Sequence, residues 1–374
     1  MFDGTHIYEY ADMRKGFHPD WNSYIFNYKS GEVRSFLVSS ARFWFDKFHI
    51  DGIRVDAVSS MLKLDYSRKA GEWDPNEFGG NGNIEAIEFI KILNETIYRD
   101  FPDVQTIAEE STDWPKVSKP TFDGGLGFGM KWMLGWMHDT LDYFKMDPFL
   151  RQYHQGKFTF SMMYFYDENF MLPLSHDEVV HGKKPMINKM PGDEWQRFAN
   201  LRLMYTYMYT HPGAKLLFMG DEFGQTTEWN YKSELDWHLL QYDPHKKLKE
   251  CVKRLNFLYR EQTALHELQF DKDGFEWIGL DHVSEGVIAY KRKGKNSHED
   301  LLIILNMTPV VRTDWKLQVH GKSVWKEIFN SDGTGYWGTG DVFNPYPQIK
   351  LIEKKTLLYE INIHLPALAG LIFQ

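Results

Sequence analysis

The sequence predicts a mixed α/β chain, in which helices alternate with parallel strands, followed by a smaller all-β domain. Between residues 31 and 267, segments with helical spacing alternate with short apolar runs, a pattern typical of βα units around a parallel sheet. After residue 268 the chain changes to short β-rich segments separated by turn residues, at residues 286–294, 300–308, 322–329, 356–365 and 367–373. We therefore predict two domains, residues 1–268 and residues 269–374.

The helices of the first domain are predicted from apolar residues that recur every three or four positions. They cover residues 31–48, 83–101, 193–209 and 245–267. The first is expected to be amphipathic, and the residues spaced to cover its apolar side are Val33, Phe36, Leu37, Ala41, Phe43 and Trp44.

The strands of the first domain number at most five. They lie near residues 50–57, 105–109, 131–135, 170–174 and 215–219. A closed (β/α) barrel needs eight strands, and the chain begins with a loop-like segment and then a helix. The strands therefore fit either an open sheet or a barrel whose other strands would precede Met1.

Composition excludes several classes of protein. Lys and Arg total 43 against 52 Asp and Glu, so the net charge is −9 and a nucleic-acid binder is not expected. No window holds the run of about 18 apolar residues that a membrane span needs, and the N-terminus lacks the features of a signal peptide. One cysteine, Cys251, cannot form an internal disulfide, so we expect a cytoplasmic protein with this thiol on a helix face.

The first strand places two opposite charges on one face. A strand period of two puts Arg54 and Asp56 opposite Ile53 and Val55. In a barrel that face is the lumen, and charged residues at its C-terminal end are typical of catalysis. A structural ion pair between Arg54 and Asp56 is the alternative that this strand leaves open.

Further carboxylates follow later strands. The second strand ends in Glu109 and Glu110, and parity does not decide which of them faces inward. A later strand ends in His176 and Asp177. Because carboxyl ends of parallel strands share one edge, these acids are expected near Asp56. Two carboxyl groups about 5 to 5.5 Å apart suit retaining glycoside chemistry.

Competing motifs fit less well. His176 and His181 are spaced by five residues instead of the four of a zinc-protease helix, and the glycines of residues 125–129 do not make the dinucleotide fingerprint. Glu222 and Trp237 lie in polar, aromatic surroundings, but we interpret both as buried structural residues. We expect no metal site here.

Four motifs together resemble the glycogen (1,4-α-glucan) branching enzymes of the α-amylase superfamily. They are DGIRVDAV, TIAEEST, LPLSHDEVVHGK and KLLFMGDEFGQ, and the segments DYSRKAGEWDPNEFGG and KMPGDEWQRFANLR match this branch in particular. The resemblance covers essentially the whole chain. It implies a partial (β/α)8 barrel, about strands 4 to 8, followed by a C-terminal β-sandwich.

The resemblance also implies roles for individual residues. It makes Asp56 the nucleophile, Glu109 the proton donor and later base, and Asp177 the transition-state stabiliser, with Arg54 and His176 binding the sugar. The implied reaction cleaves an α-1,4-glucan such as glycogen or amylose and transfers the chain to a 6-hydroxyl, with no metal or organic cofactor. It is the resemblance that selects Glu109 over Glu110.

The start of the chain departs from the family pattern. The N-terminal β domain and the first three barrel strands of such enzymes have no counterpart here. We therefore expect a truncated chain that is weak or inactive alone and that self-associates through exposed barrel edges. The alternatives are a glucan-binding fragment without activity and an α-amylase-like hydrolase.

Overall fold

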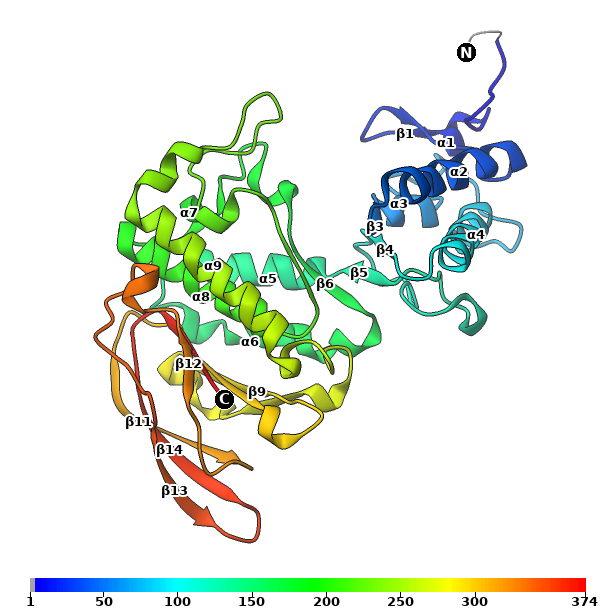
Figure 1. Cartoon of the computed structure of the whole chain (residues 1–374). Helices are drawn as coiled ribbons and strands as arrows, with labels where there is room; N and C mark the ends of the chain where they lie inside the picture. Colours follow the sequence, from blue (N-terminus) through cyan, green and yellow to red (C-terminus); the bar gives the residue numbers. More distant parts are fainter. Residues whose placement is uncertain (1–3) are drawn as a thin grey trace. The chain divides into compact units, whose positions relative to one another are not determined.

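The structure is a computed structural model that describes residues 4–374, the side chains of residues 280, 281 and 283 excepted. The chain forms two compact units (Figure 1). Unit 1 comprises the chain up to Leu134 together with Asp167–Phe170, and unit 2 comprises Gly135–Tyr166 and Met171–Gln374. The domain boundary at residue 268 stays a prediction.

Unit 1 contains a parallel sheet whose strands follow one another in chain order. Strand β3 (Gly52–Val55) pairs with β4 (Gln105–Ala108), and β4 pairs with β5 (Met130–Trp132). In this register Val55 lies opposite Ala108. The carboxyl ends of β3 and β4 therefore coincide, and the residues that follow them begin side by side.

One long helix precedes β3 and another lies between β3 and β4 in the sequence, and both begin at a side-chain cap. The Ser30 hydroxyl accepts a hydrogen bond from the Val33 amide at the start of α2 (Gly31–Phe48), and Asn83 caps α4 (Ile84–Asp100) in the same way. The helices contact each other and share one apolar core. The shorter elements of unit 1 are α1 (Met13–Gly16), β1 (Phe17–His18), β2 (Ser23–Tyr24) and α3 (Val58–Leu62).

The predicted apolar side of α2 is wrong for half of its residues. Val33 is buried, and Leu37 and Ala41 pack against the core, but Phe36, Phe43 and Trp44 are exposed. Phe45, which the spacing did not select, is buried instead. Aromatic residues occur on both sides of this helix, so periodicity alone did not identify the side that packs.

Unit 2 opens with the second part of the α/β region (Figure 1). Strand β6 (Phe170–Leu174), whose first residue belongs to unit 1, pairs in parallel with β7 (Ala214–Leu217). The helices are α5 (Leu134–Lys145), α6 (Gln155–Thr159), α7 (Met186–Lys189), α8 (Glu194–Thr210) and α9 (Asp243–Glu261). Every residue of α8 from Phe198 to Thr210 is buried, because the helix packs against both α9 and the β-sandwich.

Two antiparallel sheets form the C-terminal β-sandwich of unit 2 (Figure 1). One has the order β12-β15-β10-β9-β8 and the other the order β11-β14-β13. The strands are β8 (Phe275–Ile278), β9 (Val287–Arg292), β10 (Leu301–Asn306), β11 (Arg312–His320), β12 (Glu327–Asn330), β13 (Gln348–Glu353), β14 (Leu358–Leu365) and β15 (Ala369–Phe373). Side chains of both sheets share one core, and a Cβ on Gly370 of β15 would meet the Thr206 methyl of α8 at 2.6 Å.

Most predicted elements are confirmed. The five expected strands correspond to β3 through β7, and Cys251 is buried on α9, where burial raises the pKa of its thiol to about 12. The prediction missed β8, β11 and β13, because β11 and β13 are largely exposed, charged strands and the expectation rested on apolar runs. No helix in the described part of the chain is long and apolar enough to cross a membrane.

Candidate active site

Asp56 follows β3 directly, and its side chain is 77% exposed. The guanidinium of Arg54, on the same face of the strand, forms an ion pair with the Asp56 carboxylate. The Arg54 guanidinium also lies 4.3 Å from the ring centre of Trp132 on β5. Both readings of the sequence, a structural pair and a reactive carboxylate, therefore remain compatible with this geometry.

Glu109 follows β4 directly and is tied to the end of β3. Its amide donates to the Val55 carbonyl at 2.9 Å, and its carbonyl accepts from the Val58 amide at 2.9 Å. The Ala57 amide donates to Oε2 of Glu109 at 2.6 Å. Ala57 has a φ of 48°, a left-handed conformation unusual for a residue with a Cβ. The backbone next to Asp56 thus contacts the Glu109 carboxylate directly.

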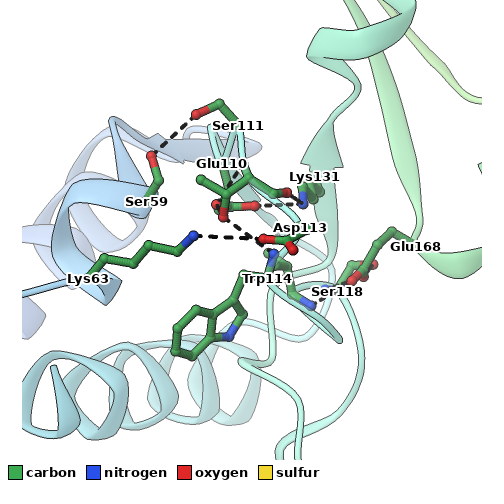
Figure 2. Close-up of polar contacts among 11 residues, drawn as sticks. Ser59, Lys63, Glu110, Ser111, Asp113, Trp114, Ser118, Lys131 and Glu168 are labelled. Carbon is green, nitrogen blue, oxygen red and sulfur yellow. Dashed lines mark hydrogen bonds and ion pairs between the residues drawn. The ribbon is translucent and has the colours of Figure 1, made fainter. Parts of the chain in front are cut away.

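Glu110 points away into the interior of unit 1 (Figure 2). Its side chain has no exposed surface, and its Oε2 lies 2.6 Å from the Lys131 ammonium of β5. Its Oε1 accepts hydrogen bonds from the amide and hydroxyl of Thr112. A substrate in solution does not reach such a carboxylate, so the two adjacent glutamates have different surroundings.

The segment that follows Glu110 is held at its far end by a second buried carboxylate. Glu168 accepts from the Val117 amide at 2.8 Å and from the Ser118 amide at 2.7 Å, and Figure 2 shows it next to Ser118. Figure 2 also shows Lys63 of unit 1 reaching Asp113, at 3.7 Å. Residues 110–118 are therefore fixed to the rest of unit 1 at several points.

His176 and Asp177 lie together in unit 2, directly after β6. Ser175 caps the short helix His176–Val179, and the Glu178 carboxylate accepts a hydrogen bond from the Ser175 amide at 2.6 Å. The His176 Nε2 lies 3.3 Å from the Asp177 carboxylate, and both side chains are about half exposed, at 40% and 52%. The cap holds both side chains at the carboxyl end of the strand.

Aromatic rings border His176. Phe218 follows β7, and its ring centre lies 5.9 Å from that of His176, while the Trp229 ring lies 6.1 Å away. Sequence reasoning missed Trp229, although it noted the aromatic, polar stretch that contains it. The buried interpretation of Trp237 is wrong, since that side chain is 49% exposed. Glu222 is half-buried and accepts from the Gly220 amide at 2.7 Å, as a structural residue would.

Unit 2 also contains a buried carboxyl group. Asp221 follows β7, and burial, reinforced by the neighbouring Glu222, raises its pKa well above the usual value. Burial also lowers the pKa of Lys189 on α7, to about 8.

Within unit 1, the arrangement presents two carboxylates at neighbouring strand ends. Retaining glycosidases use two carboxyl groups about 5 to 5.5 Å apart, and adjacent strand ends are a position from which two such groups can be presented together. An attacking carboxylate and a proton donor at this spacing can cleave a glycosidic bond through a covalent intermediate. In unit 2, an imidazole, a carboxylate and an indole provide the groups that bind sugar hydroxyls and sugar faces.

Comparison with known proteins identifies the family. A family model described as "Alpha amylase, catalytic domain" matches residues 22–256, and one described as "Alpha amylase, C-terminal all-beta domain" matches residues 277–374. The chain belongs to the α-amylase family. The predicted fold class, a partial barrel followed by an all-β domain, is thereby confirmed.

Among its curated relatives are proteins named 1,4-alpha-glucan branching enzyme GlgB. That of Aquifex aeolicus is 59% identical over 339 residues, which is 91% of this chain and 54% of the relative. That of Rubrobacter xylanophilus is 51% identical over 368 residues, which is 98% of this chain and 51% of the relative. The chain therefore spans about half the length of the relatives that it matches.

Solved structures show the same fold at low sequence identity. A pullulanase from Bacillus acidopullulyticus has a TM-score of 0.65 at 13% identity and covers 98% of this chain, with 43% of the pullulanase matched. An α-amylase from H. orenii has a TM-score of 0.59 at 16% identity, covering 94% of this chain and 66% of the amylase. These similarities concern the fold alone.

Proposed function

We propose that this chain is the catalytic part of a 1,4-α-glucan branching enzyme, a glycosyltransferase of glycogen synthesis. The substrate is an α-1,4-glucan, and the product carries a new α-1,6 branch. The observation that supports this most directly is the placement of Asp56 and Glu109 at the paired ends of β3 and β4. The names of the relatives point to the same reaction.

The proposed mechanism is a retaining double displacement. Asp56 attacks the anomeric carbon of the donor glucan while Glu109 protonates the leaving glycosidic oxygen, which gives a covalent glucan–enzyme intermediate. Glu109 then removes the proton from the 6-hydroxyl of an acceptor chain, and that oxygen displaces Asp56. Asp177 stabilises the transition state, and Arg54 and His176 bind the reacting sugar.

The surroundings of the two glutamates support this assignment. Glu110 is fully buried and paired with Lys131, so it is unsuited to contact a substrate. Glu109 is bound through its carboxylate to the backbone of Ala57, next to the proposed nucleophile. An acid/base must lie within hydrogen-bond reach of the bond that it cleaves, which favours the glutamate beside Asp56.

We also propose a cytoplasmic location and an α-glucan as the main partner. The single cysteine, Cys251, lies buried, as expected of a protein from a reducing compartment. We also propose self-association through an unpaired strand edge. Strand β3 is the end strand of the sheet in unit 1, so its outer edge can pair with a strand of another chain.

Formation of α-1,6 linkages on amylose, followed by proton NMR, tests the proposed function. We would compare the chain with Asp56→Ala and with Asp51→Ala, which removes an exposed aspartate at the opposite end of β3. Weak new α-1,6 signals from the parent and from Asp51→Ala, but none from Asp56→Ala, are expected, because the chain spans about half the length of its relatives. Signals that persist in Asp56→Ala would remove Asp56 from the nucleophile role.

Two other outcomes correspond to the alternatives. Reducing ends without α-1,6 signals would identify an α-amylase-like hydrolase, in which water replaces the acceptor hydroxyl. Sedimentation with insoluble glucan but no chemistry by any variant would identify a glucan-binding fragment. Either result would contradict branching by this chain.

A further inference from the structure

Lys131 is a buried cation that the proposed mechanism does not use. It lies on β5, its side chain is only 8% exposed, and its ammonium lies 2.6 Å from Oε2 of Glu110 (Figure 2). The ammonium also donates to the Thr112 carbonyl at 3.0 Å. A single lysine therefore binds both ends of residues 110–112, the bend that follows Glu109.

The residues on both sides of Glu109 are anchored. On the β3 side, the Glu109 amide and carbonyl bind Val55 and Val58. On the β5 side, the next residue is bound by Lys131. The backbone of Glu109 thus lies between two anchored neighbours, and its carboxylate is left on the face that it shares with the end of β3.

We propose that Lys131 is a positioning residue for the Glu109 carboxylate and acts through Glu110. The inference rests on the proposed function, in which Glu109 is the acid/base. A proton donor must lie about 2.6 to 3.2 Å from its acceptor, and a displacement of about 1 Å can lower the rate about 100-fold. Burying an ion pair is a weak source of stability, so a geometric role explains this pair better than a stabilising one.

Leaving-group chemistry distinguishes positioning from a structural role. Cleavage of amylose requires a proton for the leaving sugar, whereas α-maltosyl fluoride releases fluoride without one. We would measure both reactions for Lys131→Met and for the double variant Glu110→Gln/Lys131→Met, which removes both charges and so leaves no buried charge unpaired. Lys131→Arg, which keeps the charge, tests rescue.

The chain offers a matched control in Lys291→Met. Lys291 is also a strand lysine, is 7% exposed and lies 3.1 Å from the Glu276 carboxylate, but it belongs to β9 of the β-sandwich. It controls for the loss of a buried strand lysine, although its partner Glu276 is 35% exposed. Glucan transfer by Lys291→Met is expected to stay within about twofold of the parent.

For Lys131→Met and for the double variant we expect kcat on amylose to fall about 10- to 100-fold with KM within about twofold of the parent. The first burst of fluoride from α-maltosyl fluoride should fall less than about threefold. Partial recovery in Lys131→Arg is expected. Equal losses on both substrates, or kcat on amylose within twofold of the parent, would overturn the proposal.

A parent chain inactive on both substrates would contradict the proposed function, and a second measurement would then decide the role of Lys131. Hydrogen exchange of the amides of residues 109–114 needs no turnover. We expect exchange about tenfold faster in the double variant than in the parent and in Lys291→Met. Unchanged exchange would show that Lys131 does not hold residues 109–114 in place.

Discussion

Glu109 and Glu110 are neighbours of the same residue type, yet their surroundings differ in every respect that matters for chemistry. Glu109 binds the backbone beside Asp56, whereas Glu110 is buried against Lys131. At the residue scale, the consequence is that identical substitutions at the two positions should differ in their effect on stability.

Glu109→Gln is expected to lower glucan transfer by about 10²- to 10⁴-fold, because it removes the proposed proton donor, with little change in stability. Glu110→Gln is expected to lower the free energy of unfolding by about 3 kcal/mol, because it leaves the buried Lys131 ammonium without its partner. Urea unfolding and the NMR assay measure the two effects. A Glu110→Gln protein as stable as the parent would contradict the assigned burial.

His211 provides a prediction for the pH dependence of stability. Its ring is buried, Nε2 lies 3.1 Å from the Ser161 hydroxyl, and Nδ1 lies 2.7 Å from the Pro212 carbonyl. Burial lowers the pKa of His211 to about 3, and the nearby Lys215 and Arg292 act in the same direction. The folded chain therefore holds this imidazole neutral far below the pKa of about 6.5 that it has when unfolded.

Because the unfolded state binds the proton first, stability should fall as pH falls from about 6.5 toward 3, by up to about 1.4 kcal/mol per pH unit from this group. Above pH 6.5, His211 should contribute no slope. Urea unfolding between pH 4 and 8 measures this for the parent and for His211→Asn. The same slope in both proteins below pH 6.5 would show that His211 is not the group responsible.

At the scale of elements, Arg292 joins the α/β part of unit 2 to the β-sandwich. It lies on β9, is fully buried, and donates to the carbonyls of Thr210 at 2.8 Å, Leu265 at 3.1 Å and Gly274 at 3.3 Å. Its pKa is lowered to about 10 by burial. One guanidinium thus satisfies carbonyls at the end of α8, after α9 and before β8.

Arg292→Met is expected to lower the free energy of unfolding by about 3 kcal/mol, because it removes the Arg292 donor from the buried Thr210 and Leu265 carbonyls, whereas the Gly274 carbonyl keeps the Lys293 amide at 3.0 Å. Arg260→Met is the control, since Arg260 is an exposed residue of α9. Denaturant unfolding measures both. A loss below about 1 kcal/mol in Arg292→Met would mean that the Thr210 and Leu265 carbonyls find other donors.

At the scale of the whole molecule, α2 presents an aromatic stripe, which we define as Phe36, Phe43, Trp44 and Phe48. These side chains are 46% to 57% exposed, and the rings of Trp44 and Phe48 lie 4.8 Å apart. A contiguous apolar surface of this kind favours association, and it adds to the open side of β3. We therefore expect the purified chain to self-associate.

Trp44→Glu/Phe48→Glu is expected to shift the chain toward the monomer in sedimentation velocity, because charges disfavour burial of the stripe. Phe122→Glu is the control, since Phe122 is 91% exposed and lies on the short helix Thr121–Asp123, away from α2 in the sequence. A monomeric parent, or association that the double variant leaves unchanged, would contradict this expectation.

The sequence by itself determined the order of the long helices and of the five parallel strands, the α-amylase family and the strand ends that carry Asp56, Glu109 and Asp177. It could do so because strand parity, helix spacing and short motifs are local properties of the chain. The choice between Glu109 and Glu110 came from the resemblance. The alternation of side chains along a strand does not predict which way a residue just beyond the strand points.

Only the tertiary structure decided which apolar residues of α2 pack, that α8 is buried on all sides, and that Lys131 on β5 neutralises Glu110 after β4. Each of these depends on contacts between residues far apart in sequence, and a local pattern carries no record of its partner. The physical reason is burial. A charge removed from water requires an opposite charge nearby, and for Glu110 that charge is Lys131 of the neighbouring strand.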